Sequence, residues 1–185
     1  MWALVKASQV IEIINSPKAM TINGVQYPSS IFRVWSASQL KAIGLYSYSL
    51  TGMKDTFYYS TGSITHVVDD SAGTVVGTYA TSARDMSGLK KAWVEKIKST
   101  AGSLISKYDW LTLRFAQSGT AIPKNVNTYM NSIRANSGIM ETKVNAASDV
   151  DALVALDTST YHANGDINVI ADLQNWPEDP NAPSE

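Results

Sequence analysis

The sequence predicts an α+β fold, in which a mainly antiparallel β domain (residues 1–82) precedes a helical hairpin domain with an extended tail (residues 83–185). Short apolar runs separated by turn residues fill the first part of the chain. Apolar residues then recur at spacings of three and four over two long stretches, as on amphipathic helices. Three prolines within seven residues, from Pro177 to Pro183, favour an extended end.

Two hairpins are expected at the beginning of the β domain. In the first, a four-residue break separates two apolar runs. In the second, the turn is Asn23-Gly24, which is the strongest short hairpin signal because both positions tolerate a positive φ. A further apolar segment of this paired-strand region follows Pro28. The apolar segments are residues 2–5, 10–14, 19–22, 25–27 and 31–35.

A short helix is predicted at residues 36–44. Ser36 can cap its first turn, and Gln39, three residues later, completes a capping box. Gly44 stands where a helix ends in the left-handed conformation. Leu40 and Ile43 are expected to face the sheet.

Alternating apolar and polar residues predict four more strands before residue 82. Gly52, Gly62 and Gly73 mark turns between them, together with Asp69-Asp70. The acidic loop at 69–73 lacks the ligand spacing and the terminal glutamate of a calcium loop, so a plain turn is the preferred interpretation. The predicted strands are residues 45–48, 57–59, 64–68 and 74–79.

Two amphipathic helices should form an antiparallel pair in the second domain. The first runs from Met86 to about Ile105, with Asp85 or Ser87 as its cap, and its lysines form a solvated face. The second begins with Pro123 in its first turn and is about 22 residues long. An ordered loop carrying Asp109, Trp110 and Arg114 is expected to join them, with Trp110 as a core anchor.

A short third helix is predicted at residues 148–156, capped by Ser148. Residues 158–170 fit a loop, a short strand or a turn of helix equally well. Trp176 precedes Pro177 and is therefore extended, and it should dock on the helix pair. Gly138 inside the second helix suggests close approach of another element.

Composition excludes several classes of function. The net charge is -1, from 15 basic and 16 acidic residues, which argues against a nucleic-acid-binding surface. Without cysteine there is no disulfide or thiolate metal site. No apolar run approaches the roughly 20 residues that span a bilayer, so no membrane partner is expected. The N-terminus does not resemble a signal peptide, which makes an intracellular origin the expectation.

No catalytic or cofactor-binding constellation is visible in the sequence. His66 and His162 are isolated, and neither a nucleophile elbow nor a phosphate-binding loop is present. A carboxylate pair of Asp109 and Glu141 has no supporting features. The structural interpretation is that Asp109 pairs with Arg114 or Arg134. A cation–π stack of Trp110 on Arg134 is the alternative to the preferred role of Trp110 as a core anchor. The sequence therefore predicts a non-enzymatic protein without cofactor or metal.

One pattern resembles a known family. A lysine-rich helix is followed by Tyr108-Asp109-Trp110, and then by Arg114, Pro123, Tyr129, Arg134 and Trp176-Pro177. This order is similar to the C-terminal region of small tailed-bacteriophage proteins described as tail-fibre assembly or tail-assembly chaperone-like. Residues 1–46 are more loosely similar to uncharacterised phage proteins. The chain departs from the pattern at Met130, where the family has an arginine.

The resemblance implies a role in phage tail or tail-fibre assembly. Partners would be tail or tail-fibre proteins, and the protein would be found in the virion tail or in the host cytoplasm during assembly. It would be either a structural subunit, which would follow the particle's symmetry as a homo-oligomer, or a chaperone-like factor that departs. The resemblance and the aromatic anchors place partner binding at Asp109, Trp110, Arg114, Tyr129, Arg134 and Trp176.

Two functions of other classes are kept as alternatives. A glycan-acting hydrolase of a phage tail would need two carboxylates about 5–10 Å apart across a groove. A nucleic-acid-binding phage protein would need the lysines of residues 90–98 to join Lys107 and Arg114 in one basic face.

Overall fold

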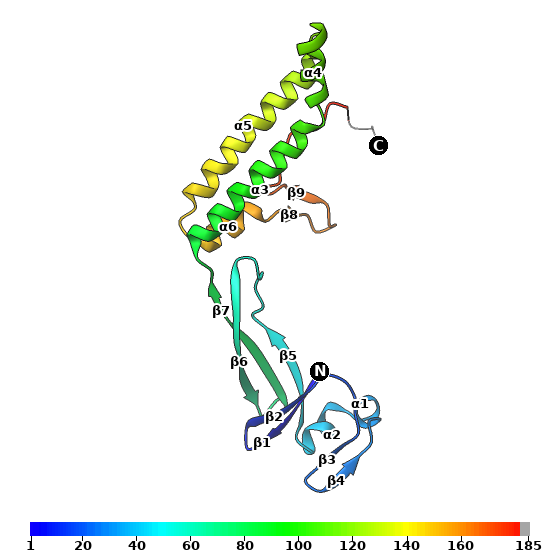
Figure 1. Cartoon of the computed structure of the whole chain (residues 1–185). Coiled ribbons are helices and arrows are strands. Elements are labelled where there is room, and N and C mark those ends of the chain that lie inside the picture. The colour runs from blue at the N-terminus through cyan, green and yellow to red at the C-terminus, as the bar shows by residue number, and fades with distance from the viewer. Residues whose placement is uncertain (182–185) are drawn as a thin grey trace. The chain divides into compact units, whose positions relative to one another are not determined.

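The computed structural model describes residues 1–181, and the chain divides into two compact units, Met1–Ser82 and Ala83–Glu185. The fold is α+β, as predicted, with the sheet strands in the first unit and the long helices in the second (Figure 1).

The first unit is built on one five-stranded sheet with the order β2-β1-β5-β7-β6. β1 pairs antiparallel with both β2 and β5, whereas β5 and β7 pair parallel. The sheet is therefore mixed. In the β6–β7 hairpin, β7 is the strand that lies next to β5, and β6 forms the edge of the sheet. The strands are β1 (Trp2–Lys6), β2 (Gln9–Ile14), β5 (Leu45–Thr51), β6 (Tyr59–Asp69) and β7 (Thr74–Ala83).

The sheet has an apolar core on each face. On one face, Ala3, Val5 and Tyr48 form a buried cluster with Tyr46 and Val75. The two edge strands β2 and β6 approach each other, so the sheet curls. Alternate residues of β1 point to the opposite face, as the period of a strand requires.

Short elements cover that opposite face. The hairpin of β3 (Met20–Ile22) and β4 (Val25–Tyr27) packs there with α1 (Ile31–Val34) and α2 (Ala37–Ala42). The expectation that residues 31–35 belong to the paired strands is wrong, since Ile31 and Phe32 are buried on a helical turn. The Phe32 ring lies 4.7 Å from that of Trp2, and this packing outweighs the β propensity of the segment.

Most local signals in the first unit are confirmed. Ser36 and Gln39 form the predicted capping box, and Gly44 has a φ of 86°. The turn Asn23-Gly24 is confirmed. The break between β1 and β2 is a two-residue turn at Ala7-Ser8, not four residues, because both adopt a positive φ.

The strands predicted at 57–59 and 64–68 are not separate. Tyr59 to Asp69 is one continuous strand, and Gly62 lies inside it. The carbonyl oxygen of Ala80 on β7 lies only 3.3 Å from where a Cβ would stand at this position. Gly62 therefore does not mark a turn. The absence of a side chain at this position lets β6 lie close to the backbone of β7.

The second unit is organised around the helix pair α3 (Met86–Ser106) and α5 (Lys124–Ala146), which pack antiparallel as predicted (Figure 1). Asp85 caps α3 by accepting a hydrogen bond from the Gly88 N–H at 2.7 Å. Pro123 is the N-cap residue of α5. The second helix is thus 23 residues long, close to the predicted length.

The segment that joins the pair is not the predicted loop but a helix, α4 (Asp109–Ser118). Leu111, one turn before Phe115, is its buried residue, and Gly119 ends it with a φ of 69°. The spacing of these two apolar residues and the glycine that follows are helix signals, and they outweigh the loop interpretation.

The remaining elements complete the second unit. Asp149, not Ser148, caps α6 (Val150–Asp157), because its carboxylate accepts from the Ala152 N–H at 2.8 Å. The ambiguous stretch 158–170 contains a small hairpin of β8 (Thr160–Tyr161) and β9 (Ile167–Val169). We call residues 171–181, which follow it, the C-terminal segment.

Candidate partner-binding surface

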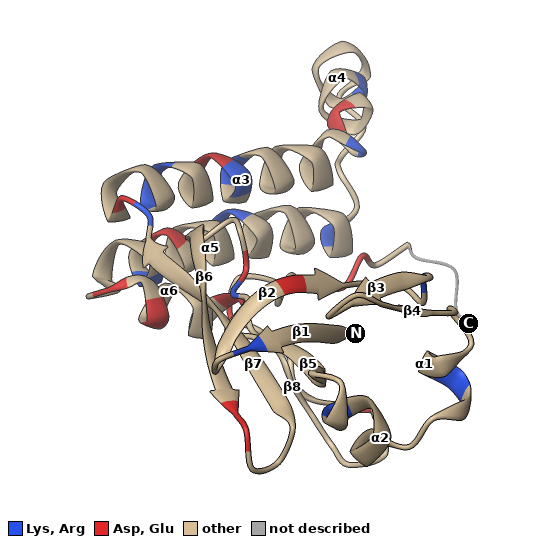
Figure 2. Cartoon of the chain, turned by 90° about the horizontal axis from the view of Figure 1, so that it is seen from below, with Lys and Arg blue, Asp and Glu red and all other residues tan. Residues whose placement is uncertain are grey.

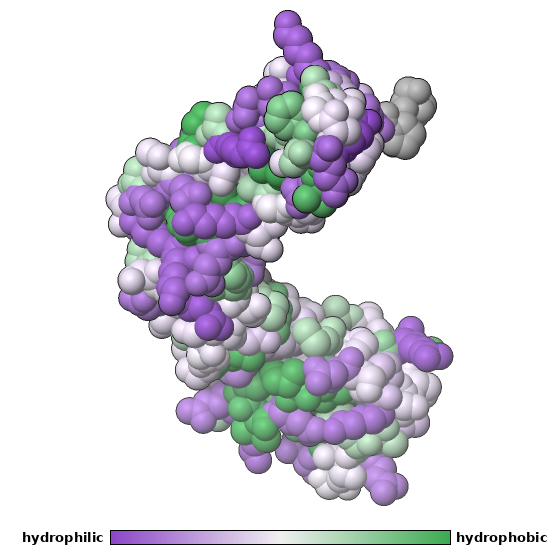
Figure 3. Space-filling view, turned by 45° about the horizontal axis from the view of Figure 1, so that its top comes forward, coloured by the Kyte–Doolittle hydropathy of each residue, from purple (hydrophilic) through white to green (hydrophobic). Residues whose placement is uncertain are grey.

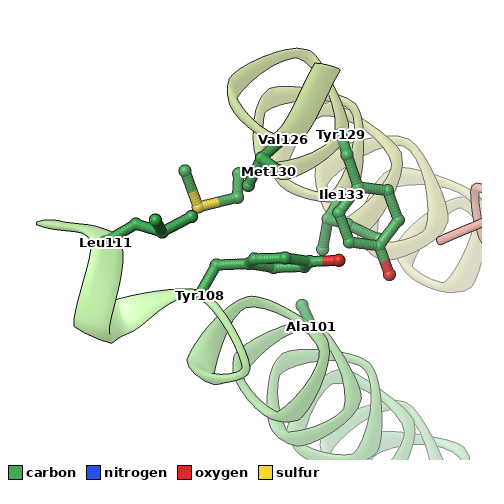
Figure 4. Close-up of a cluster of buried hydrophobic side chains, with 7 residues drawn as sticks. All are labelled: Ala101, Tyr108, Leu111, Val126, Tyr129, Met130 and Ile133. Atoms are coloured by element: carbon green, nitrogen blue, oxygen red, sulfur yellow. The ribbon is translucent and has the colours of Figure 1, made fainter. Parts of the chain in front are cut away.

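The α3–α4 junction rests on a buried cluster between α3, α4 and α5 (Figure 4). The Tyr108 ring lies between the ends of the two long helices and meets the Tyr129 ring edge-on at 5.8 Å. This packing fixes where α4 leaves α3. The members of the cluster are Ala101, Tyr108, Leu111, Val126, Tyr129, Met130 and Ile133.

On the side of α4 that faces away from this cluster, large apolar side chains are exposed to solvent. Trp110 is 56% exposed and Leu113, one turn later, is 63% exposed. The guanidinium of Arg114 lies over the Trp110 ring, 5.1 Å from its centre, in a cation–π contact. We call Trp110, Leu113 and Arg114 the α4 surface. Phe115, on the neighbouring side of the helix, is 52% exposed.

The structure corrects three expectations about Trp110 and its neighbours. Trp110 is not a core anchor, because Tyr108 and Leu111 fill the core at this junction. Its cation–π partner is Arg114, one turn away on the same helix, and not Arg134. In the described part of the chain, no ion pair joins Asp109 to Arg114 or Arg134, since Asp109 is exposed in the first turn of α4.

The other predicted binding residues are spread over the unit. Tyr129 is only 5% exposed and belongs to the buried cluster, so it is not part of an exposed aromatic patch. Arg134 is exposed on α5 and donates to the Asn131 side chain at 3.0 Å. Trp176 packs half-buried against the buried cluster, which confirms that it docks on the helix pair.

Polar contacts hold the C-terminal segment near Tyr108. The phenol of Tyr108 donates a hydrogen bond to the carboxylate of Asp179, which also lies 3.6 Å from the ammonium of Lys107. This hydrogen bond raises the pKa of Tyr108 and lowers the pKa of the Asp179 carboxyl. Sequence reasoning found the docking of Trp176 but missed this contact, which joins residues 71 positions apart.

Three of the four lysines of α3 are engaged within the protein. The Lys98 ammonium lies 3.4 Å from the carboxylate of Glu141, and Lys90 donates to the Asn145 carbonyl at 2.8 Å. Lys96 lies over the ring of Trp93, 4.1 Å from its centre. The expectation that Glu141 is simply solvated is therefore wrong, because it pairs across the two helices.

Elsewhere, the residues considered for chemistry have structural contacts. His66 lies 3.4 Å from the phenol oxygen of Tyr48. Asp69 accepts hydrogen bonds from the Ser71 hydroxyl and from the N–H groups of Ser71 and Ala72, and these bonds, the hydroxyl's above all, lower the pKa of its carboxyl. The acidic loop is therefore the predicted turn. Among residues 1–181 there is no group of His, Cys, Asp and Glu arranged to hold a metal ion. No helix in that range is long and apolar enough to cross a membrane.

Comparisons with protein families, curated proteins and solved structures found no match to this chain. The assignment of the α4 surface as a binding site therefore rests on the structure of this chain. In the space-filling view, green apolar residues are interspersed among purple hydrophilic ones on the visible face (Figure 3). The α4 surface combines two large apolar side chains with one cation on a single short helix.

Proposed function

We propose that the chain is a non-enzymatic bacteriophage tail or tail-fibre protein that acts through protein–protein contacts, with the α4 surface as its main binding site. One observation carries the proposal. Trp110 and Leu113 are exposed at the start of α4, whereas Tyr108 and Leu111 beside them are packed in the buried cluster. Tryptophan and arginine are among the residue types enriched at binding hot spots.

The resemblance to tail-fibre assembly proteins supports the same location. Its Asp109-Trp110 element begins α4, and Arg114 holds the indole from the next turn. The departure at Met130 does not affect this surface, because Met130 is 4% exposed in the buried cluster. Of the six residues first considered for partner binding, we retain the exposed Asp109, Trp110 and Arg134 and the half-buried Arg114.

A capture experiment tests the binding site. Affinity-tagged protein is recovered from phage-infected cells, and bound proteins are identified by mass spectrometry. The double variant Trp110→Ser, Leu113→Ser is compared with Ile139→Ser, which removes a similarly exposed (55%) apolar residue from α5. We expect the wild-type and control proteins to retain a tail or fibre protein and the double variant to lose it. Capture of no tail protein by any of the three would refute the proposal.

Mass spectrometry of purified particles then separates the two roles. A copy number that is a multiple of three or six means a structural subunit, since tails and fibres have these symmetries. Absence from particles, together with presence in infected cells and capture of a fibre protein, means an assembly factor.

A further inference from the structure

Charge in the second unit is segregated along the chain. Residues 83–146, which contain α3, α4 and α5, carry ten Lys and Arg but only four Asp and Glu. Residues 147–181 carry seven Asp and Glu and neither Lys nor Arg. The near-neutral net charge of the chain therefore conceals a basic helix pair and an acidic segment after it. Figure 2 shows blue Lys and Arg positions along α3 and α5.

The acidic part contacts the basic part at both ends of the C-terminal segment. The carboxylate of Asp172 lies 2.7 Å from the ammonium of Lys143 on α5. At the other end, Asp179 contacts Lys107 and Tyr108 at the α3–α4 junction. These ion pairs are partly exposed and hence individually weak.

Apolar anchors lie between the two charged ends. Leu173 is buried, and Trp176 packs against the buried cluster of the helix pair. Between Leu173 and Trp176 the chain turns, since the Trp176 N–H donates to the Gln174 carbonyl, and the Asn175 carbonyl accepts a hydrogen bond from Asn136 of α5. Beyond Trp176, Pro177 and Pro180 favour an extended backbone, and extended proline-containing segments are a recurrent form of bound peptide.

The C-terminal segment leaves much of this surface open. A groove of about 600 Å³ lies between α5 and the prolines of the segment, and Thr128 and Tyr129 line its helical side. A second cavity of about 260 Å³ lies beside Trp176 and is lined by Trp93 and Ile97 of α3. A bound peptide could therefore make more contacts here than the protein's own segment does.

We propose that this face of the α3–α5 pair is a peptide-binding groove for an acidic, extended, tryptophan- and proline-containing segment of a partner protein, and that the C-terminal segment occupies it as an intramolecular competitor. The bound segment itself shows which chemistry the groove accepts. A partner peptide would displace it by matching its anchors and filling the adjoining cavities. The proposal concerns a surface distinct from the α4 surface and does not depend on the phage assignment.

Fluorescence anisotropy with a labelled peptide that has the sequence of residues 171–181 tests the proposal. The full-length double variant Trp176→Ala, Asp179→Asn weakens the internal competitor while leaving every residue of the helices unchanged. We expect this variant to bind the peptide at least tenfold more tightly than the wild-type chain does. Raised salt should weaken the binding, because carboxylates contact lysines.

Two further comparisons make the result specific. A peptide carrying the same two substitutions should lose binding, because it lacks the indole and the carboxylate. Adding Lys107→Glu to the double variant should also weaken binding, because it replaces the partner of Asp179 by a like charge. If circular dichroism shows that the double variant is unfolded, Asp179→Asn alone, which leaves the Trp176 anchor in place, is used instead.

Three results would overturn the proposal. The first is equal affinity of the wild-type and folded variant chains for the peptide. The second is equal binding of the native and substituted peptides. The third is preference for an oligonucleotide of similar charge over the peptide, which would mean that the basic helices bind nucleic acid. Loss of peptide binding on Trp110→Ser would show that the two surfaces are not distinct.

Discussion

Gly77 on β7 provides the sharpest test of the packing in the first unit. A Cβ at this position would lie 2.0 Å from the phenol oxygen of Tyr48 and 2.8 Å from its ring carbon Cζ. It would also lie 3.0 Å from Leu50 Cδ1. Contacts under 3.0 Å cannot be tolerated, and Tyr48 is a buried member of the core on this face of the sheet. The aromatic ring must therefore leave its position when Gly77 becomes alanine.

The expected cost of Gly77→Ala is about 1–3 kcal/mol in the free energy of unfolding, the range for an extra methyl group in a packed core. We expect the upper half of this range, since the ring is rigid and two of its atoms are too close. Urea denaturation followed by circular dichroism measures it. Thr78→Ala, the neighbouring exposed position on the same strand, is the control and should cost under about 1 kcal/mol.

A double-mutant cycle with Tyr48→Phe tests the cause. In the wild-type background, Tyr48→Phe removes only a long contact of 3.4 Å with His66 and should cost about 0.5–1 kcal/mol or less. In the Gly77→Ala background, the same change removes the atom with the worst clash and should stabilise the protein. Equal effects in both backgrounds would refute the packing argument.

Three further predictions concern the second unit. Gly138→Ala should stabilise the protein by up to about 1 kcal/mol in urea denaturation, because nothing lies within 4 Å of the new methyl group and α5 gains helix propensity; a loss would mean that Gly138 is closely packed after all. Met130→Arg, which restores the family's arginine, should cost at least about 3 kcal/mol in the same assay, since it buries a charge among apolar residues, and a neutral result would show that the position is accessible. Finally, the pKa of Asp179 is lowered from its ordinary value of 3.8, so its contribution is present above pH 3.8 and is lost as the pH falls through the folded-state value. The wild-type and Asp179→Asn proteins should therefore differ in stability at about pH 7 and converge in acid, and a difference that persists in acid would contradict this linkage.

Gly138 also shows where a sequence argument failed. A glycine inside a helix suggests close approach of another element, but the structure shows open space there. Gly77 has no distinguishing signal in the sequence, although a buried tyrosine lies directly against it. Whether a glycine is needed depends on which side chain crosses it, and that side chain can come from a distant strand.

The candidate site was only partly predictable for the same reason. Trp110, Tyr129 and Trp176 are three aromatic residues of similar apparent weight in the sequence. In the structure they are exposed, buried and half-buried, respectively. The periodicity of α5 placed Tyr129 correctly on the stripe that faces α3, whereas the orientation of α4 decided that Trp110 points outward.

Local sequence signals were sufficient to predict the Asn23-Gly24 hairpin, the capping box at Ser36, the long helices and the α+β order. These depend on backbone conformation and side-chain period, which neighbouring residues dictate. The parallel pairing of β5 with β7, the helical form of α1 and the contact of Asp179 with Tyr108 could be known only from the tertiary structure. Each of these joins or shields residues far apart in the chain, so the energy that selects it arises only once the distant surfaces have met.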